Sequence, residues 1–283
     1  MTALPTPLIS AQQLHQRMGD QKLVILDASY YMPAMQRDGA AEWASARIGD
    51  AQHFDFDQKI CEPGAEYPHT MPSAELFQSS VTALGISTDS KIVVYDGMGM
   101  FASPRAWWMF KAMGHPQVSV LNGGLPAWQA EGFALNTEPP KVTPRGDFVA
   151  KYDSSLFSDT ETVLMALQDD GARVLDARSA GRFAGNEAEP RAGLRGGHMP
   201  GAKNLPFTNL LQDGFLKPAT ELKDQLAAVA KPEQRLIFSC GSGVTACHLA
   251  LAAEVAGYPQ LSVYDGSWCE WGARPELPVT IDR

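Results

Sequence analysis

The residue best suited to chemistry is Cys240, in the segment "LIFSCGSGVTACHLALAAEVAG" that begins at Leu236. The apolar residues before it are typical of a buried strand, and the pattern after it, from about Val244 to Ala256, predicts a helix. A cysteine at such a junction lies beside the positive end of the helix dipole, which favours the thiolate. We therefore predict that Cys240 is a nucleophile.

The loop after Cys240 indicates what the thiolate acts on. Gly241 and Gly243 let the backbone turn successive N–H groups inward, and such a nest binds an anion. A phosphatase loop of the pattern C-x5-R has an arginine six residues after its cysteine, where this chain has Ala246. Because the loop carries no cation of its own, it favours a neutral or singly charged sulfur centre over a dianion. The alternative interpretation is a buried structural cysteine.

Landmarks of the first half of the chain recur in the second at an offset of about 145 residues, which indicates duplicated domains. "VILDAS" returns as "RVLDARS", "KIVVYDG" as "RLIFSCG", and "HPQVSVLNGGLPAW" as "YPQLSVYDGSWCEW". We predict domains at 1–138 and 150–283, with a linker at 139–149. Asp96 takes the place of Cys240 in the first domain. A carboxylate cannot carry a sulfane sulfur, so we expect that domain to be catalytically silent.

Each half alternates β-branched segments such as "KIVVYD" with helical patterns such as "PRAWWMFKAMG". The alternation predicts an α/β fold in which each domain is a parallel sheet with helices on both faces. Ligands of such open sheets bind beyond the carboxyl ends of the strands, and Cys240 falls at that position.

The composition excludes several classes of function. The chain has 283 residues, 45% of them hydrophobic and 19% charged, which is typical of a globular protein. Its formal net charge of -9 argues against nucleic acid or an anionic membrane as the main partner. No apolar run approaches the roughly 20 residues of a membrane helix, and no secretory signal is recognised.

Cysteine usage bears on location and on metals. The four cysteines are dispersed and form no C-x-x-C pair, so we expect a reducing cytoplasm. Cys247 and His248 are adjacent on the predicted helix, and adjacent residues lack the spacing of metal ligands. We expect no metal site.

Two half-chains of this pattern, "GHMPGA" in the second, and a cysteine loop in the second alone resemble the tandem rhodanese family of sulfurtransferases. The resemblance covers nearly the whole chain. Within the family, "CGSGVTA" is similar to the loop of the bacterial 3-mercaptopyruvate sulfurtransferases, whereas thiosulfate sulfurtransferases typically carry basic residues there. The resemblance implies that the loop cradles a persulfide with Gly241, Ser242, Gly243, Val244 and Thr245.

The resemblance also implies roles for arginines outside the loop. Arg182 in "GRF" and Arg191 in "EPR" match the pair that binds the substrate, and guanidinium groups bind carboxylates bidentately. We expect Arg178 and Arg195 to be structural or at the surface.

A Ser-His-Asp relay of the family corresponds here to Ser242, His69 and Asp57. The imidazole would move the proton of the substrate thiol or of the departing enolate. His198 in "GHMPGA" is expected to fix a turn.

The activity that follows is transfer of sulfur from 3-mercaptopyruvate, through a persulfide on Cys240, to cyanide, a small thiol or thioredoxin. Pyruvate is released, thiol acceptors finally yield hydrogen sulfide, and no cofactor is required. Two alternatives stay open: a thiosulfate sulfurtransferase, and a non-catalytic rhodanese-like module that binds a partner or senses oxidants through Cys240.

Overall fold

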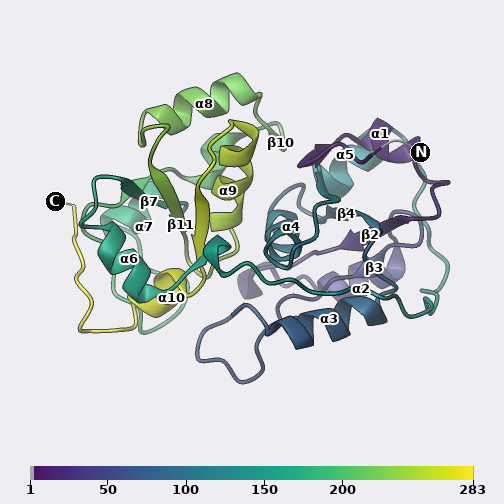
Figure 1. Ribbon diagram of the computed structural model, residues 1–283, viewed down its shortest axis with the longest axis horizontal. Coiled ribbons are helices and arrows are strands. Elements are labelled where there is room, and N and C mark those ends of the chain that lie inside the picture. The colour runs from purple at the N-terminus through teal and green to yellow at the C-terminus, as the bar shows by residue number, and fades with distance from the viewer. Residues whose placement is uncertain (1–2, 283) are drawn as a thin grey trace. The chain divides into compact units, whose positions relative to one another are not determined.

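The computed structural model describes residues 3–282, which divide into two compact units (Figure 1). Within these residues, unit 1 comprises 3–63 and 71–153, and unit 2 comprises 64–70 and 154–282. The short segment 64–70, which carries His69, therefore packs with unit 2 although it lies in the first half of the sequence.

Unit 1 is built on a parallel sheet with the strand order β1-β5-β4-β2-β3. Its strands are β1 (Leu8–Ile9), β2 (Leu23–Asp27), β3 (Gln52–His53), β4 (Lys91–Tyr95) and β5 (Val118–Leu121). Its helices are α1 (Ala11–His15), η1 (Pro33–Met35), α2 (Gly39–Ser45), α3 (Ala74–Ala83), α4 (Ser103–Ala112) and α5 (Gly124–Ala130).

Unit 2 repeats this topology with a parallel sheet in the order β6-β12-β11-β7-β8. Its strands are β6 (Phe157–Ser158), β7 (Ala172–Asp176), β8 (Lys203–Asn204), β11 (Arg235–Ser239) and β12 (Leu261–Tyr264). Its helices are η2 (Ser154–Leu156), α6 (Thr160–Ala166), α7 (Ala180–Ala184), η3 (Phe207–Leu210), α8 (Ala219–Ala227), α9 (Ala246–Val255) and α10 (Ser267–Trp271).

The two sheets have the same order when strands are matched through the sequence repeat, with β4 equivalent to β11. The predicted α/β fold of two parallel sheets flanked by helices is confirmed. A small antiparallel hairpin, β9 (Leu211–Gln212) and β10 (Phe215–Leu216), is added in unit 2. Its turn, Asp213–Gly214, has positive φ at both residues (52° and 84°), which suits the right-handed twist of a tight hairpin.

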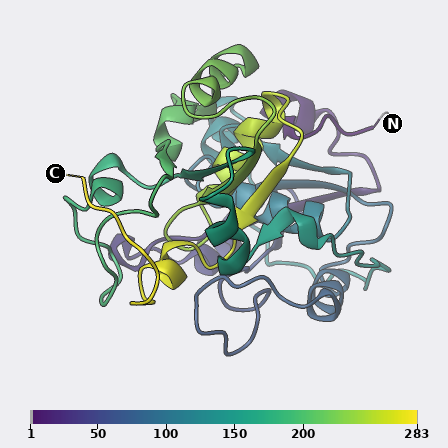
Figure 2. The same ribbon diagram turned by 60° about the vertical axis from the view of Figure 1, so that its left-hand side comes forward.

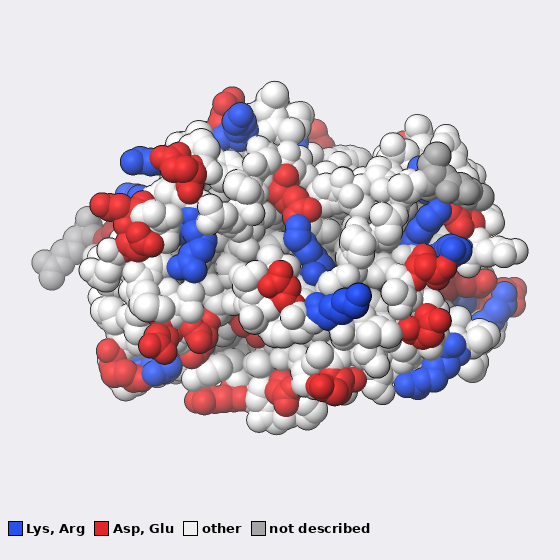
Figure 3. All heavy atoms as spheres, viewed as in Figure 1, with Lys and Arg blue, Asp and Glu red and all other residues white. Residues whose placement is uncertain are grey.

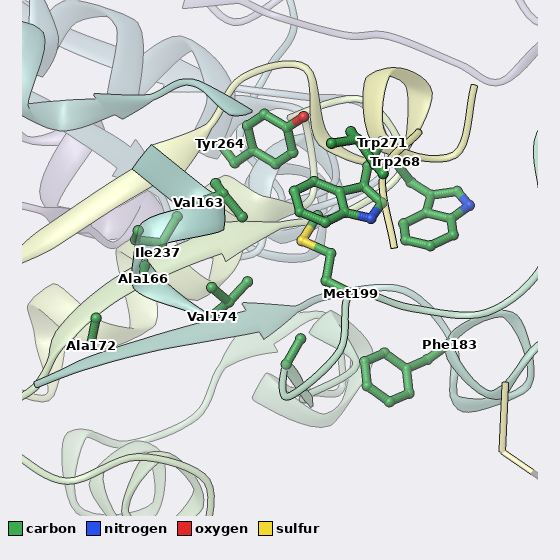
Figure 4. Close-up of a cluster of buried hydrophobic side chains, with 12 residues drawn as sticks. Val163, Ala166, Ala172, Val174, Phe183, Met199, Ile237, Tyr264, Trp268 and Trp271 are labelled. Carbon is green, nitrogen blue, oxygen red and sulfur yellow. The ribbon is translucent and has the colours of Figure 1, made fainter. Parts of the chain in front are cut away.

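Alternate residues of β11 face opposite layers of unit 2. Ile237 joins a buried cluster with Val174, Trp268 and Trp271, to which α6, α7 and α10 contribute (Figure 4). Leu236 and Phe238 are also fully buried but lie outside this cluster, because successive strand residues point to opposite faces. They face the layer of α9, which lies against β11 and β12 (Figure 2). The sheet is thus covered on both sides, and its carboxyl edge holds the loops.

Residues 139–153 carry no helix or strand. Phe148 is nevertheless buried and lies edge-on to Phe77 and Phe110. The N–H of Gly146 donates to the carbonyl of Thr82, and that of Lys151 to the carbonyl of Met113. This extended stretch is therefore packed along unit 1.

Acidic side chains are interspersed with basic ones on the face drawn in Figure 3, which shows no extended basic patch. Within residues 3–282, the helices are all too short or too polar to cross a membrane.

Candidate active site

Cys240 directly follows β11 and is 1% exposed. Its loop ends where α9 begins at Ala246, so the thiol stands at the carboxyl edge of the sheet and at the amino end of a helix. Gly243 has a φ of 76°, a left-handed conformation that favours glycine, and there the loop reverses. These positions agree with the sequence prediction.

Several backbone N–H groups of the Cys240 loop make no hydrogen bond to the described residues. Five N–H groups have no hydrogen-bond acceptor among residues 3–282: those of Gly241, Ser242, Val244, Thr245 and Ala246. Buried backbone N–H groups are almost always hydrogen-bonded, so a run of open donors is unusual. A nest of this kind at a helix N-terminus attracts an anion.

The equivalent loop of unit 1 contains its own anion. Asp96 is 1% exposed, and its Oδ2 accepts hydrogen bonds from the N–H groups of Ala102 and Ser103 and from the Ser103 hydroxyl, at 2.8 to 2.9 Å. Its Oδ1 accepts from the N–H of Met98 at 2.9 Å. Two of these donors, the N–H groups of Met98 and Ala102, correspond to the open N–H groups of Ser242 and Ala246 in unit 2. The comparison indicates that the Cys240 loop is suited to an anion longer than a bare thiolate.

The first turn of α10 fixes the start of the Cys240 loop. The N–H of Cys240 donates to the hydroxyl of Ser267 at 3.1 Å, and that hydroxyl donates to the carbonyl of Tyr264 at 2.8 Å. The N–H groups of Trp268 and Cys269 donate to the carbonyls of Cys240 and Gly241 at 3.0 and 2.8 Å. Ser267 adopts a φ of 48°, which few non-glycine residues do, and strain of this kind is typical of functional loops.

Arg182 and Arg191 both lie beside Gly241. A Cβ placed on Gly241 would be 3.1 Å from Nη2 of Arg182 and 3.9 Å from Nη1 of Arg191. The two guanidinium groups therefore come together next to the cysteine loop, and their role in substrate binding stays a prediction. The lack of a side chain at residue 241 leaves them room.

The two arginines differ in their charge partners. Arg182 donates from Nε and Nη2 to the carboxylate of Glu189 at 3.2 and 2.5 Å, and this carboxylate is 2% exposed. Arg191 has no carboxylate partner among the described residues. Its charge is consequently the one left for an anionic ligand.

His69 lies at the same loop. Its Nδ1 is 3.1 Å from the hydroxyl of Ser242 and 3.3 Å from the Ser242 carbonyl, and the side chain is 3% exposed. Its φ of 62° shows that segment 64–70 holds the ring in a strained turn. Asp57 belongs to unit 1, where its Oδ2 accepts from Nε2 of Gln58 at 2.7 Å. Its part in a relay stays a prediction.

The residues expected to be structural are held by the fold. Arg178 is buried between Asp176 and Glu189 at 2.7 Å from each, with its guanidinium over the ring of Trp268. Arg195 donates to main-chain carbonyls, including those of Trp271 and Leu277. His198 stacks on Phe183 and hydrogen-bonds the carbonyl of that residue at 2.9 Å, which fixes the turn.

No cluster of three or more metal-ligating side chains occurs within residues 3–282. Cys247 is fully buried, and its Sγ donates to the carbonyl of Gly243 at 3.3 Å.

Sequence reasoning missed three residues at this site: Glu189, Ser267 and Cys269. The sequence contained one usable signal for the last two, because both fall in "YDGSWCEW", which follows the strand next to β11 and so reaches the same edge of the sheet. No sequence feature distinguished Glu189 from the other acidic residue of its loop, Glu187.

Comparison with known proteins extends this picture. The family model of the rhodanese-like domain matches the chain twice, over residues 10–131 and 160–274. The 3-mercaptopyruvate sulfurtransferase of Homo sapiens is 39% identical over 289 residues, which cover 98% of this chain and 96% of that protein. The thiosulfate sulfurtransferase of Cricetulus griseus is 42% identical over 268 residues, which cover 91% and 88%.

Among solved structures, SseA from Escherichia coli, described as a 3-mercaptopyruvate sulfotransferase with the rhodanese fold, superposes with a TM-score of 0.84. The sequences are 33% identical in that comparison, which covers 94% of this chain and 99% of the other. Similarity therefore spans both units.

Proposed function

This chain belongs to the rhodanese family, and from that premise we propose that it is a sulfurtransferase that takes sulfur from 3-mercaptopyruvate. The observation that carries the proposal is the Cys240 loop, with a buried thiol, five open backbone donors and no cation of its own. A persulfide anion is longer than a thiolate and singly charged, so it fits this cradle.

The reaction begins when the Cys240 thiolate attacks the sulfur of 3-mercaptopyruvate. The bond between that sulfur and the substrate's methylene carbon breaks, and its electron pair leaves with the enolate of pyruvate. The proton of the substrate thiol passes to the enolate carbon, which gives pyruvate and a persulfide anion on Cys240. Open N–H groups of the loop stabilise this anion, because donors that are already in place need no reorganisation when the charge forms.

Substrate orientation is assigned to the two arginines beside Gly241. Arg191 binds the donor's carboxylate, because its charge has no carboxylate partner among the described residues. Arg182 is oriented by Glu189 and donates to the ketone or the carboxylate from the other side.

Ser242 and His69 are proposed to handle the proton. With Nδ1 of His69 at 3.1 Å from the Ser242 hydroxyl, a proton can pass along one hydrogen bond between the loop and the imidazole. Asp57 is proposed from family resemblance alone as the third member of this relay.

A second nucleophile then removes the outer sulfur from Cys240. Cyanide, small thiols and reduced thioredoxin are the proposed acceptors, and the proposed location is the cytoplasm. Thiol acceptors carry the sulfur as a persulfide and release it as hydrogen sulfide when a further thiol attacks. The proposal requires no metal or organic cofactor.

Thiosulfate is the second candidate donor, favoured by the 42% identity to a thiosulfate sulfurtransferase. The uncharged loop argues against it, since thiosulfate carries two negative charges and "CGSGVTA" offers them N–H groups and hydroxyls but no cation. Measuring kcat/KM for both donors with cyanide as acceptor decides between them. We expect a clear preference for 3-mercaptopyruvate; a preference for thiosulfate would reverse the donor assignment.

A further inference from the structure

A second thiol, that of Cys269, lies at the Cys240 loop and has no part in the proposed transfer. Cys269 is in the first turn of α10 and is 5% exposed. The N–H of Cys269 donates to the carbonyl of Gly241 at 2.8 Å, and the N–H of Trp268 donates to the carbonyl of Cys240 at 3.0 Å. These two hydrogen bonds hold the backbone of Cys269 alongside the start of the loop.

The thiol of Cys269 lies within electrostatic range of Cys240 and of both arginines. Burial raises the pKa of the Cys269 thiol, the charges of Arg191 and Arg182 lower it, and those of Cys240 and Glu189 raise it. Both guanidinium groups also flank Gly241, at 3.1 and 3.9 Å from the position of a Cβ there. The backbone of Cys269 and both guanidinium groups therefore lie beside Gly241, the residue that follows Cys240.

These surroundings allow Cys269 to rest as a protonated thiol and to react as a thiolate. Burial keeps Cys269 protonated, so it does not compete with Cys240 for the donor. The neighbouring guanidinium groups stabilise negative charge on its sulfur when a proton acceptor appears. The departing sulfur of a persulfide is such an acceptor.

We propose that Cys269 is a resolving thiol that attacks the inner sulfur of the Cys240 persulfide when no external acceptor is present. The inference rests on the proposed function, which supplies the persulfide. The bond between Cys240 Sγ and the outer sulfur breaks, and a bond forms between the two Sγ atoms. The proton of Cys269 moves to the outer sulfur, which leaves as hydrosulfide. That sulfur is reduced while the thiol of Cys269 is oxidised, so no outside oxidant is needed.

The product is a Cys240–Cys269 disulfide, in which the nucleophile is blocked. A dithiol reductant restores both thiols by exchange. The enzyme would thus stop after one turnover when acceptors are scarce and restart when reductant returns.

Cys247 supplies the matched control. It is buried close to the same loop, but its thiol is held by the carbonyl of Gly243, and the equivalent residue in unit 1 is Ser103. In unit 1 the hydroxyl of Ser103 donates to the carboxylate of Asp96, so the fold accommodates a serine at this position. We expect Cys247→Ser to form the Cys240–Cys269 disulfide as the unaltered protein does.

The test uses the full chain, one equivalent of 3-mercaptopyruvate and no acceptor. Hydrosulfide is quantified, and the alkylated protein is analysed by mass spectrometry before and after proteolysis. The unaltered protein and Cys247→Ser should release close to one hydrosulfide per chain and yield a linked peptide pair with Cys240 and Cys269. Cys269→Ser should retain one added sulfur on Cys240 and release little hydrosulfide; Cys269→Ala serves if the serine variant misfolds by circular dichroism.

The outcomes separate the two proposals. If the unaltered protein keeps its persulfide as long as Cys269→Ser does, or links Cys240 to Cys247 instead, the resolving role is overturned and the proposed function stands. If neither protein gains sulfur on Cys240, the proposed function fails, and the resolving role fails with it.

Discussion

The carboxylate of Glu189 accepts hydrogen bonds from Arg182 at 3.2 and 2.5 Å while it is 2% exposed. The same carboxylate accepts from Arg178 at 2.7 Å. One buried anion thus positions the guanidinium that lies beside the cysteine loop. Asp176 supplies the second negative charge of the cluster. Arg178 and Arg182 are thus neutralised by two carboxylates, and Arg191 is not.

Glu189→Gln should lower the free energy of unfolding by roughly 3 kcal/mol, because breaking one side of a buried ion pair leaves uncompensated charge. The same substitution should raise KM for 3-mercaptopyruvate, since Arg182 loses its orientation. Chemical denaturation and initial-rate kinetics measure the two effects. Glu187→Gln is the control: Glu187 is exposed, and its loss should cost less than about 0.5 kcal/mol. Equal effects of the two variants would contradict the positioning role.

Arg191→Ala should lower kcat/KM for 3-mercaptopyruvate by about 30-fold or more, the equivalent of ~2 kcal/mol or more for a lost charge-assisted hydrogen bond. Arg182→Ala should weaken use of the same donor. Discharge of a preformed persulfide to cyanide binds no carboxylate, so its single-turnover rate should change little in Arg191→Ala. Equal loss in both half-reactions, or with a donor that lacks a carboxylate, would refute the assignment.

The buried carboxyl of Asp27 predicts how the free energy of unfolding depends on pH. Burial raises the pKa of this carboxyl from 3.8 to about 6. Since the folded state holds the proton more tightly than the unfolded state, the stabilisation by this group is full below pH 3.8 and is lost as pH rises through 6. Asp27→Asn removes the charge that must otherwise be buried, and near neutral pH it should stabilise unit 1 by up to about 3 kcal/mol.

The measurement is the difference in unfolding free energy between Asp27→Asn and the unaltered protein, followed from pH 4 to 7.5. We expect the difference to grow over this range. Asp176→Asn is the control, because Asp176 occupies the equivalent position in unit 2 but pairs with Arg178 at 2.7 Å. Its substitution should destabilise. A pH-independent difference for Asp27→Asn would show that the carboxyl is ionised throughout.

Much of the fold was predictable because it follows from local residue patterns that occur in both halves of the sequence. The β-branched segments predicted the central strands of both sheets, and the strand-to-helix junction predicted the place of Cys240. Arg182 and Arg191 were identified by family resemblance, and the structure brings both beside Gly241. Such features depend on neighbours in sequence or on a motif.

The remaining features depend on packing between distant segments. Segment 64–70 leaves unit 1 to pack with unit 2, and no local pattern encodes where a turn docks. The hydrogen bond from Cys240 to Ser267 joins residues 27 positions apart. Glu189 could not be distinguished from the acidic residues around it, because its importance comes from burial between two guanidinium groups.

The central claim is that Cys240 carries the transferred sulfur. The most direct test is mass spectrometry of the Cys269→Ser variant after one equivalent of 3-mercaptopyruvate, with Cys240→Ser in the same background as control. We predict one added sulfur on the peptide that contains Cys240, release of an equal amount of pyruvate, and neither change in the control. Pyruvate release without sulfur on Cys240, or added sulfur that persists in the Cys240→Ser control, would contradict the account.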